Sequence, residues 1–246
     1  MARLVRHFVE EPRPCSYLPG VKASLEYRLM VDVTPLELEG LLERGWRRFG
    51  PAYFRPSCGL CNACDSIRLD VHRFDPTPSQ RRALKRSKRF RVELSRPKID
   101  PQRLALHARW HGTREDARGW EPTNLTEDEY ATQFAFPSTT GRELAWYDGD
   151  ELMAVSLVDL TPNSVSAAYF FYDPRIARLS PGIGNVMRCV ELARELGAQH
   201  MYLGYRVMNC ASLQYKGLFG PHELLHGRPG PADTPVWTEV AHAPPE

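Results

Sequence analysis

Long hydrophobic runs, a secretory leader, a P-loop and the Gly-x-Ser-x-Gly hydrolase motif are missing from the 246 residues. No apolar stretch approaches the ~18 residues that a membrane-spanning helix needs. Residues 1–11 are charged and contain no apolar leader segment. The sequence also has no P-loop and no Gly-x-Ser-x-Gly elbow. These absences argue against a membrane protein, a secreted protein, a P-loop ATPase and the hydrolases that carry those motifs.

Cysteine is scarce as well. The chain has six cysteines and no visible leader, which favours free thiols in a reducing compartment over a disulfide scaffold. We therefore expect a cytoplasmic protein that contacts no membrane. The length predicts one or two domains, and a charged fraction of 25% with 10% aromatic residues is typical of a folded chain.

Positive charge is concentrated in one sector, although the net charge is only +2. Residues 80–118 hold 13 Lys and Arg against 4 Asp and Glu. Seven cations without an intervening acid lie at Arg81, Arg82, Lys85, Arg86, Lys88, Arg89 and Arg91. Like charges at i,i+4 spacing destabilise a helix by about a few tenths of a kcal/mol, and a phosphate backbone would supply the counter-charge. We favour nucleic-acid contact over the alternative, a solvated basic face.

Local signals divide the first half of the chain into short elements. Thr34, Pro35 and Glu37 provide the cap, first-turn proline and capping-box acid of a helix that ends near Gly45. Ser79 is expected to cap a second helix that begins at Gln80. Further expected elements are strands at 25–33 and 67–74 and helices at 101–112 and 125–134.

The second half follows the order β-hairpin, β, α, β. Strands are expected at 143–147 and 152–160 around the hairpin signal Asp148-Gly149. A third strand at 165–172, a helix at 182–196 and a fourth strand at 200–205 follow. This order predicts an α+β fold with an N-acetyltransferase-like (GNAT-type) core. We expect a cysteine-containing N-terminal subdomain at 1–75, a catalytic domain at 76–226 and an irregular, proline-rich tail at 227–246.

Four cysteines form a candidate metal site. Cys58, Cys61 and Cys64 are spaced so that their thiols can converge on one metal centre, and Cys15 is the candidate fourth ligand. Zinc and an iron–sulfur centre are both compatible with such ligands. The alternatives are partly buried free thiols or a Cys-x-x-Cys redox pair.

A second candidate site follows the core strands. Gly182 and Gly184 occupy the strand-to-helix junction where acetyl-CoA enzymes of this fold bind pyrophosphate, but Leu179 replaces the usual Arg or Gln. The glycines therefore serve either substrate binding or a tight turn. Arg206 and Lys216 follow the last core strand, where ligands of this fold bind, and we favour a functional role for both.

Several blocks in order resemble the aminoacyl-tRNA–protein transferases of the N-degron pathway. They are Pro14-Cys15-Ser16-Tyr17-Leu18-Pro19, Leu42-x-x-Gly45-Trp46-Arg47-Arg48, Tyr53-x-Arg55-Pro56 followed by the three cysteines, Ser79-Gln80-Arg81-Arg82, Ala167-x-Tyr169-x-Phe171-Tyr172-Asp173-Pro174, Tyr202-Leu203-Gly204-Tyr205 and Tyr215-Lys216-x-x-Phe219-x-Pro221. They span residues 14–221. The triple-cysteine spacing is similar to the bacterial aspartate/glutamate leucyltransferase branch.

The resemblance implies an aminoacyltransferase that moves leucine, with arginine as the alternative, from charged tRNA to the N-terminal amine of proteins beginning with Asp or Glu, which marks them for degradation. This transfer requires no cofactor. The alternatives are a non-catalytic RNA-binding protein built on an acyltransferase-like core and a coenzyme-A-dependent N-acetyltransferase.

The implied roles can be assigned to residues. Tyr172, Tyr205 and Tyr215 are candidates for donating a proton to the oxyanion or to the leaving oxygen. Arg206 and Lys216 are the candidate cations for the acidic acceptor. The candidate tRNA-binding residues are Arg81, Arg82, Lys85, Arg86 and Arg89.

Overall fold

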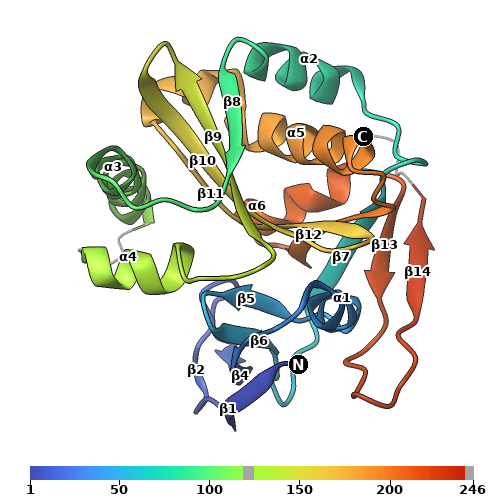
Figure 1. Ribbon diagram of the computed structural model, residues 1–246. Helices are drawn as coiled ribbons and strands as arrows, with labels where there is room; N and C mark the ends of the chain where they lie inside the picture. The colour runs from blue at the N-terminus through green and yellow to red at the C-terminus, as the bar shows by residue number, and fades with distance from the viewer. Residues whose placement is uncertain (119–124, 242–246) are drawn as a thin grey trace.

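The computed structural model describes residues 1–118 and 125–241, which form two main sheets with helices on both faces of the larger one (Figure 1). The four-stranded sheet has the spatial order β1 (Arg3–Val9), β4 (Leu25–Val31), β6 (Ala52–Pro56), β5 (Arg47–Phe49). The eight-stranded sheet has the order β14 (Trp237–Val240), β13 (His222–Leu225), β7 (Cys64–Asp70), β12 (His200–Val207), β11 (Ser164–Tyr172), β10 (Glu151–Leu160), β9 (Gly141–Asp148), β8 (Arg91–Ser95). Strands β2 (Arg13–Pro14) and β3 (Lys22–Ala23) pair separately.

The helices occupy the connections between these strands. They are α1 (Pro35–Glu43), α2 (Pro78–Ser87), α3 (Pro101–Arg118), α4 (Glu127–Phe134), α5 (Pro181–Glu195) and α6 (Ala211–Gln214), with the 3-10 helices η1 (Pro174–Leu179) and η2 (Tyr215–Leu218). Within the described ranges, no helix has the length and apolar character needed to cross a membrane.

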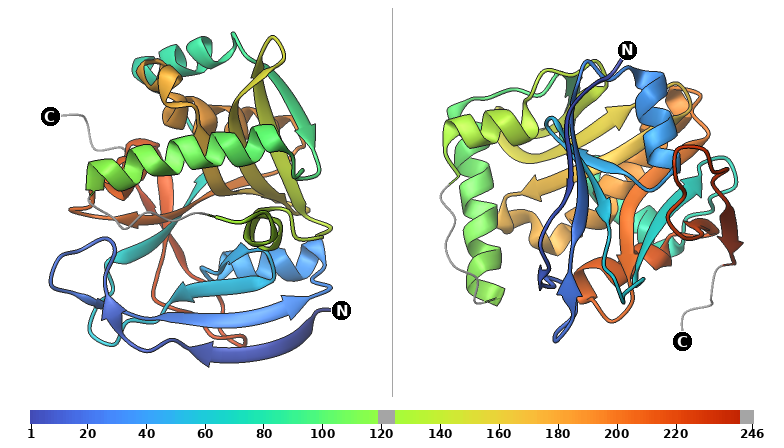
Figure 2. Two further views of the ribbon diagram at one scale, coloured as in Figure 1. Left: turned by 90° about the vertical axis from the view of Figure 1, so that its left-hand side faces the viewer. Right: turned by 90° about the horizontal axis from the view of Figure 1, so that it is seen from below.

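The large sheet carries a hydrophobic cluster on each face. Helix α5 packs on β11 and β12 through Val186 and Val190, and α2 lies against α5 (Figure 1). On the opposite face α3 and α4 bury Leu106 and Tyr130 against β10 and β11. The four-stranded sheet and α1 lie on the side of the large sheet away from α2, and β5 contacts α4 (Figure 1 and Figure 2).

The expected GNAT-type core is confirmed. Strands β9 and β10 form the hairpin at Asp148-Gly149, β11 follows antiparallel to β10, and α5 leads to β12, which runs parallel to β11. The chain therefore has the β-hairpin, β, α, β order that its hydrophobic runs and turn signals predict.

Three local expectations need correction. Helix α2 is capped by Thr77 and not by Ser79. The Thr77 hydroxyl accepts a hydrogen bond from the Gln80 backbone N–H, and the Gln80 side-chain oxygen accepts one from the Thr77 backbone N–H. Helix α3 continues past Gly112 to Arg118. The tail is not irregular throughout, because Trp237–Val240 pairs with β13; residues 242–246 lie outside the described part.

The expected domain boundary after residue 75 remains a prediction. Strand β7 lies on its N-terminal side, yet it pairs with β12 and β13 inside the eight-stranded sheet. The segment before Asp75 therefore contributes a strand to the same sheet as the catalytic core.

Candidate active site between strands β11 and β12

The two parallel strands of the core pair over only a short distance. Residues 164–166 of β11 pair with residues 200–202 of β12, after which the pairing ends while both strands continue. A cavity of about 350 Å³ lies there between the two strands, and α3, α5, α6 and η2 complete its wall. The unpaired ends of the core strands thus create the cleft that the fold predicts.

Lys216 of η2 lines this cleft. Burial, and next the nearby Arg47 guanidinium, lower the pKa of Lys216 to about 7, although Cys210 has a smaller opposing effect. A lysine with this pKa is partly neutral at pH 7 and can therefore accept a proton.

Arg47 lies near Lys216 at the base of the cleft. Its side chain is only 6% exposed and donates to the Ser166 hydroxyl at 3.2 Å and the Gly204 carbonyl at 3.0 Å. The Arg47 Nε has no hydrogen-bond partner among the described residues. Arg47 comes from β5 of the small sheet, so the two sheets meet at the candidate site.

Gly204 allows Lys216 to approach the strand this closely. Its φ of +91° lies in the region that favours glycine, and a Cβ at this position would lie 3.1 Å from the Lys216 Nζ. A side chain at position 204 would therefore strain the backbone and crowd the lysine.

Two of the three predicted tyrosines face the cleft. Tyr172 and Tyr215 both line it, and neither hydroxyl makes a hydrogen bond to any residue in the described ranges. Burial raises the pKa of Tyr215; Arg114 opposes this effect and Tyr172 adds to it. The Tyr215 hydroxyl therefore stays protonated near neutral pH, and both hydroxyls are free to donate to a ligand.

Tyr205 and Arg206 are directed elsewhere. The Tyr205 hydroxyl is buried and donates to the Gly45 carbonyl at 2.8 Å, so it ties β12 to the end of α1. The Arg206 guanidinium donates to Asp65 at 2.9 Å. Neither residue lines the cleft, and the geometry favours Tyr172, Tyr215 and Lys216 over these two.

The two predicted glycines have different surroundings. Gly182 lines the cleft, and a Cβ there would meet nothing within 4 Å, so a ligand has room to approach. A Cβ on Gly184 would lie 3.2 Å from the Ser87 Cβ, where α5 packs against α2. Gly184 therefore serves helix packing.

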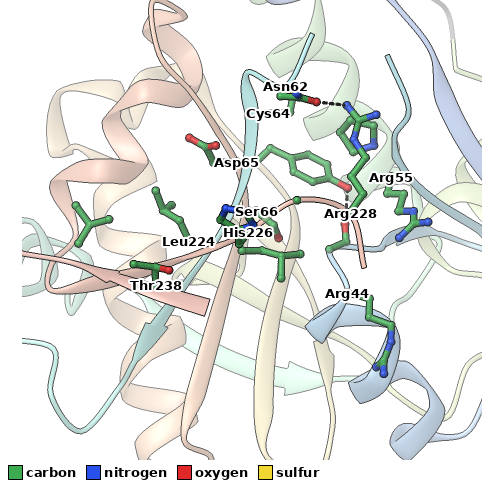
Figure 3. Close-up of a pocket in the computed structure, with 16 residues that line it drawn as sticks. Arg44, Arg55, Asn62, Cys64, Asp65, Ser66, Leu224, His226, Arg228 and Thr238 are labelled. Carbon is green, nitrogen blue, oxygen red and sulfur yellow. Dashed lines mark hydrogen bonds between the residues drawn. The ribbon is translucent and has the colours of Figure 1, made fainter. Parts of the chain in front are cut away.

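A larger cavity of about 730 Å³ lies between the small sheet and β13 (Figure 3). Three arginines line it, but each donates hydrogen bonds to other residues of the chain. Arg44 donates to the Gly230 carbonyl. Arg55 donates to Glu26 and the Pro229 carbonyl, and Arg228 donates to the Cys58 and Cys61 carbonyls. These contacts tie the tail to the N-terminal region. The cleft at Lys216 is the better candidate for chemistry.

Comparisons with known proteins agree with this arrangement of sequence blocks. Residues 13–82 match the family model "Arginine-tRNA-protein transferase, N terminus", and residues 102–226 match the corresponding C-terminal model. An aspartate/glutamate leucyltransferase of Helicobacter hepaticus is 34% identical over 236 residues, covering 96% of this chain and 98% of that protein. The chain belongs to the aminoacyl-tRNA–protein transferase family.

Further relatives and structures were found. The leucyltransferase of Halorhodospira halophila is 34% identical over 217 residues, covering 87% of this chain and 91% of that protein. Among solved structures, L-PGS from Bacillus licheniformis has a TM-score of 0.46 at 12% identity, covering 79% of this chain and 70% of that chain. FemX has a TM-score of 0.42 at 10% identity, covering 74% and 63%.

The transferase motifs acquire structural roles in this fold. Asp173 ends β11 and caps η1, where the Arg175 guanidinium lowers the pKa of Asp173 to about 2. Arg109 of α3 approaches the same carboxylate at 3.2 Å. This buried anion fixes the turn that leads from β11 into α5, and so positions one wall of the cleft.

The predicted helix over 80–91 ends at Ser87, so Arg81, Arg82, Lys85 and Arg86 lie on the exposed face of α2 and Arg89 lies in the exposed turn that follows it. Gln80, Ala83 and Ser87 form the buried face of the helix. Some of the cations have partners that the local sequence does not show: Arg81 lies 3.6 Å from Asp75 and Arg89 lies 3.0 Å from Asp148. Within the described residues, no ion pair engages Arg82, Lys85 or Arg86.

The four N-terminal cysteines are neighbours. Burial raises the pKa of the Cys64 thiol to about 12, with Cys58, Cys15 and Cys61 contributing in that order. All four thiols are free. Within the described residues, no three His, Cys, Asp or Glu side chains are arranged to hold a metal ion, so no step of the reaction is assigned to one and the metal remains a prediction.

Sequence reasoning missed two cations at the cleft. From the sequence, Arg47 had no role beyond its place in the N-terminal motif, because its position depends on contact between two sheets. Arg114 of α3 lines the cleft with its guanidinium 4.8 Å from the ring centre of Trp110. The i,i+4 spacing of Trp110 and Arg114 was the available signal for this pair.

Proposed function

We propose that the transferase moves leucine from Leu-tRNA to the N-terminal α-amine of proteins that begin with Asp or Glu. Its family gives aminoacyl-tRNA and a protein as the two substrates. Relatives that match nearly the whole chain are named aspartate/glutamate leucyltransferases. The observation that carries the proposal is Lys216, whose pKa is about 7, in a cleft where the core strands separate.

The composition of the cleft supports leucine as the transferred residue. Its wall includes the apolar side chains Phe170, Val186, Leu203 and Leu213. No Asp or Glu is present among the described residues that line it. A site for an arginyl group would need a carboxylate to pair with the buried guanidinium, whereas a leucyl group needs only apolar contact.

The reaction is the aminolysis of an ester. The acceptor nitrogen attacks the leucyl carbonyl, the carbon–nitrogen bond forms, and the bond to the ribose 3′ oxygen breaks. The nitrogen loses a proton and the leaving oxygen gains one. We assign neutral Lys216 to accept the proton from the amine, and the hydroxyls of Tyr172 and Tyr215 to donate to the oxyanion or the leaving oxygen.

The acceptor carboxylate requires a cation. Arg114 lines the cleft and an arginine side chain is cationic at any physiological pH, whereas Lys216 is partly neutral and Arg206 does not line the cleft. We therefore assign Arg114 to the acidic side chain of the acceptor. A charge-assisted contact contributes about 1.5–3 kcal/mol, which favours Asp over Asn by roughly one to two orders of magnitude.

A transfer assay tests the proposal against its alternatives. The protein is incubated with radiolabelled Leu-tRNA or Arg-tRNA and peptides that begin with Asp or Asn. We expect leucine on the Asp peptide. Preferred transfer of arginine would contradict the donor assignment, tRNA binding without transfer would indicate a non-catalytic RNA-binding protein, and acetyl-CoA-dependent modification would indicate an acetyltransferase.

A further inference from the structure

A second cavity lies directly beside the catalytic cleft. It has a volume of about 400 Å³ and is formed by the start of α2, the first turn of α5, and η2. The lining residues are Thr77, Pro78, Ser79, Gln80, Arg82, Ile183, Tyr215, Gly217, Leu218 and Phe219. The lining is largely apolar, and no carboxylate is present among these described residues.

The second cavity and the cleft share one wall. Tyr215 lines both, so the two spaces adjoin at this side chain. Helix α5 contributes Gly182 to the cleft and the next residue, Ile183, to the cavity. In the same way η2 contributes Lys216 to the cleft and Gly217 to the cavity. A ligand seated in the cavity therefore needs to extend past only one ring to reach Lys216.

The outer side of the cavity continues into the cationic face of α2. Arg82 lines the cavity and also belongs to the group of cations without an ion-pair partner, which includes Lys85 and Arg86. The Gln80 amide donates to the Leu218 carbonyl at 2.9 Å and holds η2 against α2. At the rim, Leu218 is 60% exposed. An exposed apolar residue next to unpaired cations suits a ligand with a flat apolar part and a negative backbone.

We propose that this cavity binds the 3′-terminal nucleoside of the aminoacyl-tRNA. This inference rests on the proposed function, because it assigns a place to the donor of that reaction. The base lies against Tyr215 and Leu218, its phosphate lies at Arg82, and the esterified ribose reaches over Tyr215 into the cleft. Stacking on an aromatic ring and pairing with a cation are the contacts that single-stranded nucleic acid uses.

The charged residues of the cavity and the cleft indicate which part of the two substrates occupies the second cavity. The acidic acceptor peptide is a poorer fit, since its charged side chain would lie on the α2 side of Tyr215, away from Arg114 in the cleft. The leucyl group is already accommodated by the apolar wall of the cleft. The nucleoside is the remaining part of the two substrates, and its phosphates continue along α2.

The test measures binding of the trinucleotide CCA, by titration calorimetry and by inhibition of Leu-tRNA use, to the whole protein. Leu218→Glu places a negative charge at the rim, and Ser79→Trp fills the cavity from an exposed position. Either variant should weaken CCA binding about tenfold or more, since stacking and phosphate contact are both lost. Leu196→Glu, at 52% exposure on the far end of α5, is the matched control and should bind CCA normally.

The outcomes separate this inference from the proposed function. Wild-type CCA affinity in both variants, or no CCA binding by the wild-type protein at millimolar concentration, would overturn the cavity assignment even if leucine is transferred. Conversely, CCA binding that both variants lose, in a protein that transfers no leucine, would uphold the cavity and reject the proposed reaction. Arg86→Glu should weaken binding of intact tRNA while CCA affinity stays within about twofold, because this cation lies beyond the cavity.

Discussion

At the scale of single residues, the function depends on placing one lysine in a partly buried, cationic environment. An amine loses its charge more readily when burial and a nearby cation both oppose the ammonium form. Lys216 meets both conditions, because η2 holds it against Gly204 and Arg47 lies close by. Arg47 keeps its position through bonds to Ser166 and the Gly204 carbonyl. Three distant segments of the chain therefore determine the state of one proton.

The first prediction concerns this proton. Transfer should fall as pH drops through about 7, since protonated Lys216 cannot accept a proton from the amine. Arg47→Met removes the cation and should move the midpoint to higher pH, whereas Arg47→Lys should keep it near 7. The measurement is kcat against pH for both variants, at a temperature where thermal unfolding shows both to be folded.

The acceptor amine also titrates, at about 7.7–8.0 in model peptides. Its titration belongs to the substrate and does not depend on residue 47. An identical midpoint in wild type and Arg47→Met would therefore assign the profile to the substrate and remove Lys216 from the role of base.

At the scale of elements, the sequence predicted those that local chemistry determines. The capping box of α1 and the Asp148-Gly149 turn appear where expected. Strands β1 and β14 were missed, because each is stabilised by a distant partner strand. Thr77 displaced Ser79 as the cap of α2 because Pro78 is favoured at the first helical position.

The same contrast applies to the site. Tyr172, Tyr215 and Lys216, which the motifs at or after core strands single out, line the cleft. Tyr205 and Arg206 lie in the same stretch, but contacts to Gly45 and Asp65 direct them elsewhere. Such contacts between segments cannot be derived from spacing along one strand.

The second prediction concerns α2. Changing Arg82, Lys85 and Arg86 to Glu should weaken tRNA binding and reduce the slope of log K against log salt. Each lost duplex phosphate contact reduces this slope by about 0.9. The control changes Arg3 and Arg6 of β1, on the small sheet, and should leave the slope unaltered. An unchanged slope in the α2 variant would remove this helix from the tRNA interface.

At the scale of the whole molecule, the N-terminal region completes the catalytic core. The small sheet contributes Arg47, which lies near Lys216, and β7 adds a strand to the large sheet beside β12. Arg228 of the tail donates hydrogen bonds to carbonyls of the cysteine loop, and Arg44 at the C-terminal end of α1 donates one to a carbonyl of the tail. Disturbing the cysteine loop is therefore expected to affect the catalytic half through these contacts.

The third prediction concerns the four cysteines. If the four thiols bind a metal, elemental analysis of anaerobically purified protein should find zinc or iron in nearly stoichiometric amount, and Cys61→Ser should lose it. Cys189→Ser is the control, because Cys189 is buried in α5 away from the loop. Metal-free protein with full activity and unchanged thermal stability would show that the thiols act without metal.

We propose that the transfer takes place in the cleft between β11 and β12, with Lys216 as the base. The most direct test is the single-turnover rate of leucine transfer from saturating Leu-tRNA to an Asp-initiated peptide, in wild type and Lys216→Met. We expect the variant to bind tRNA normally but to transfer roughly 10²–10⁴-fold more slowly, as is typical when a general base is removed. Transfer by Lys216→Met at the wild-type rate would contradict the account.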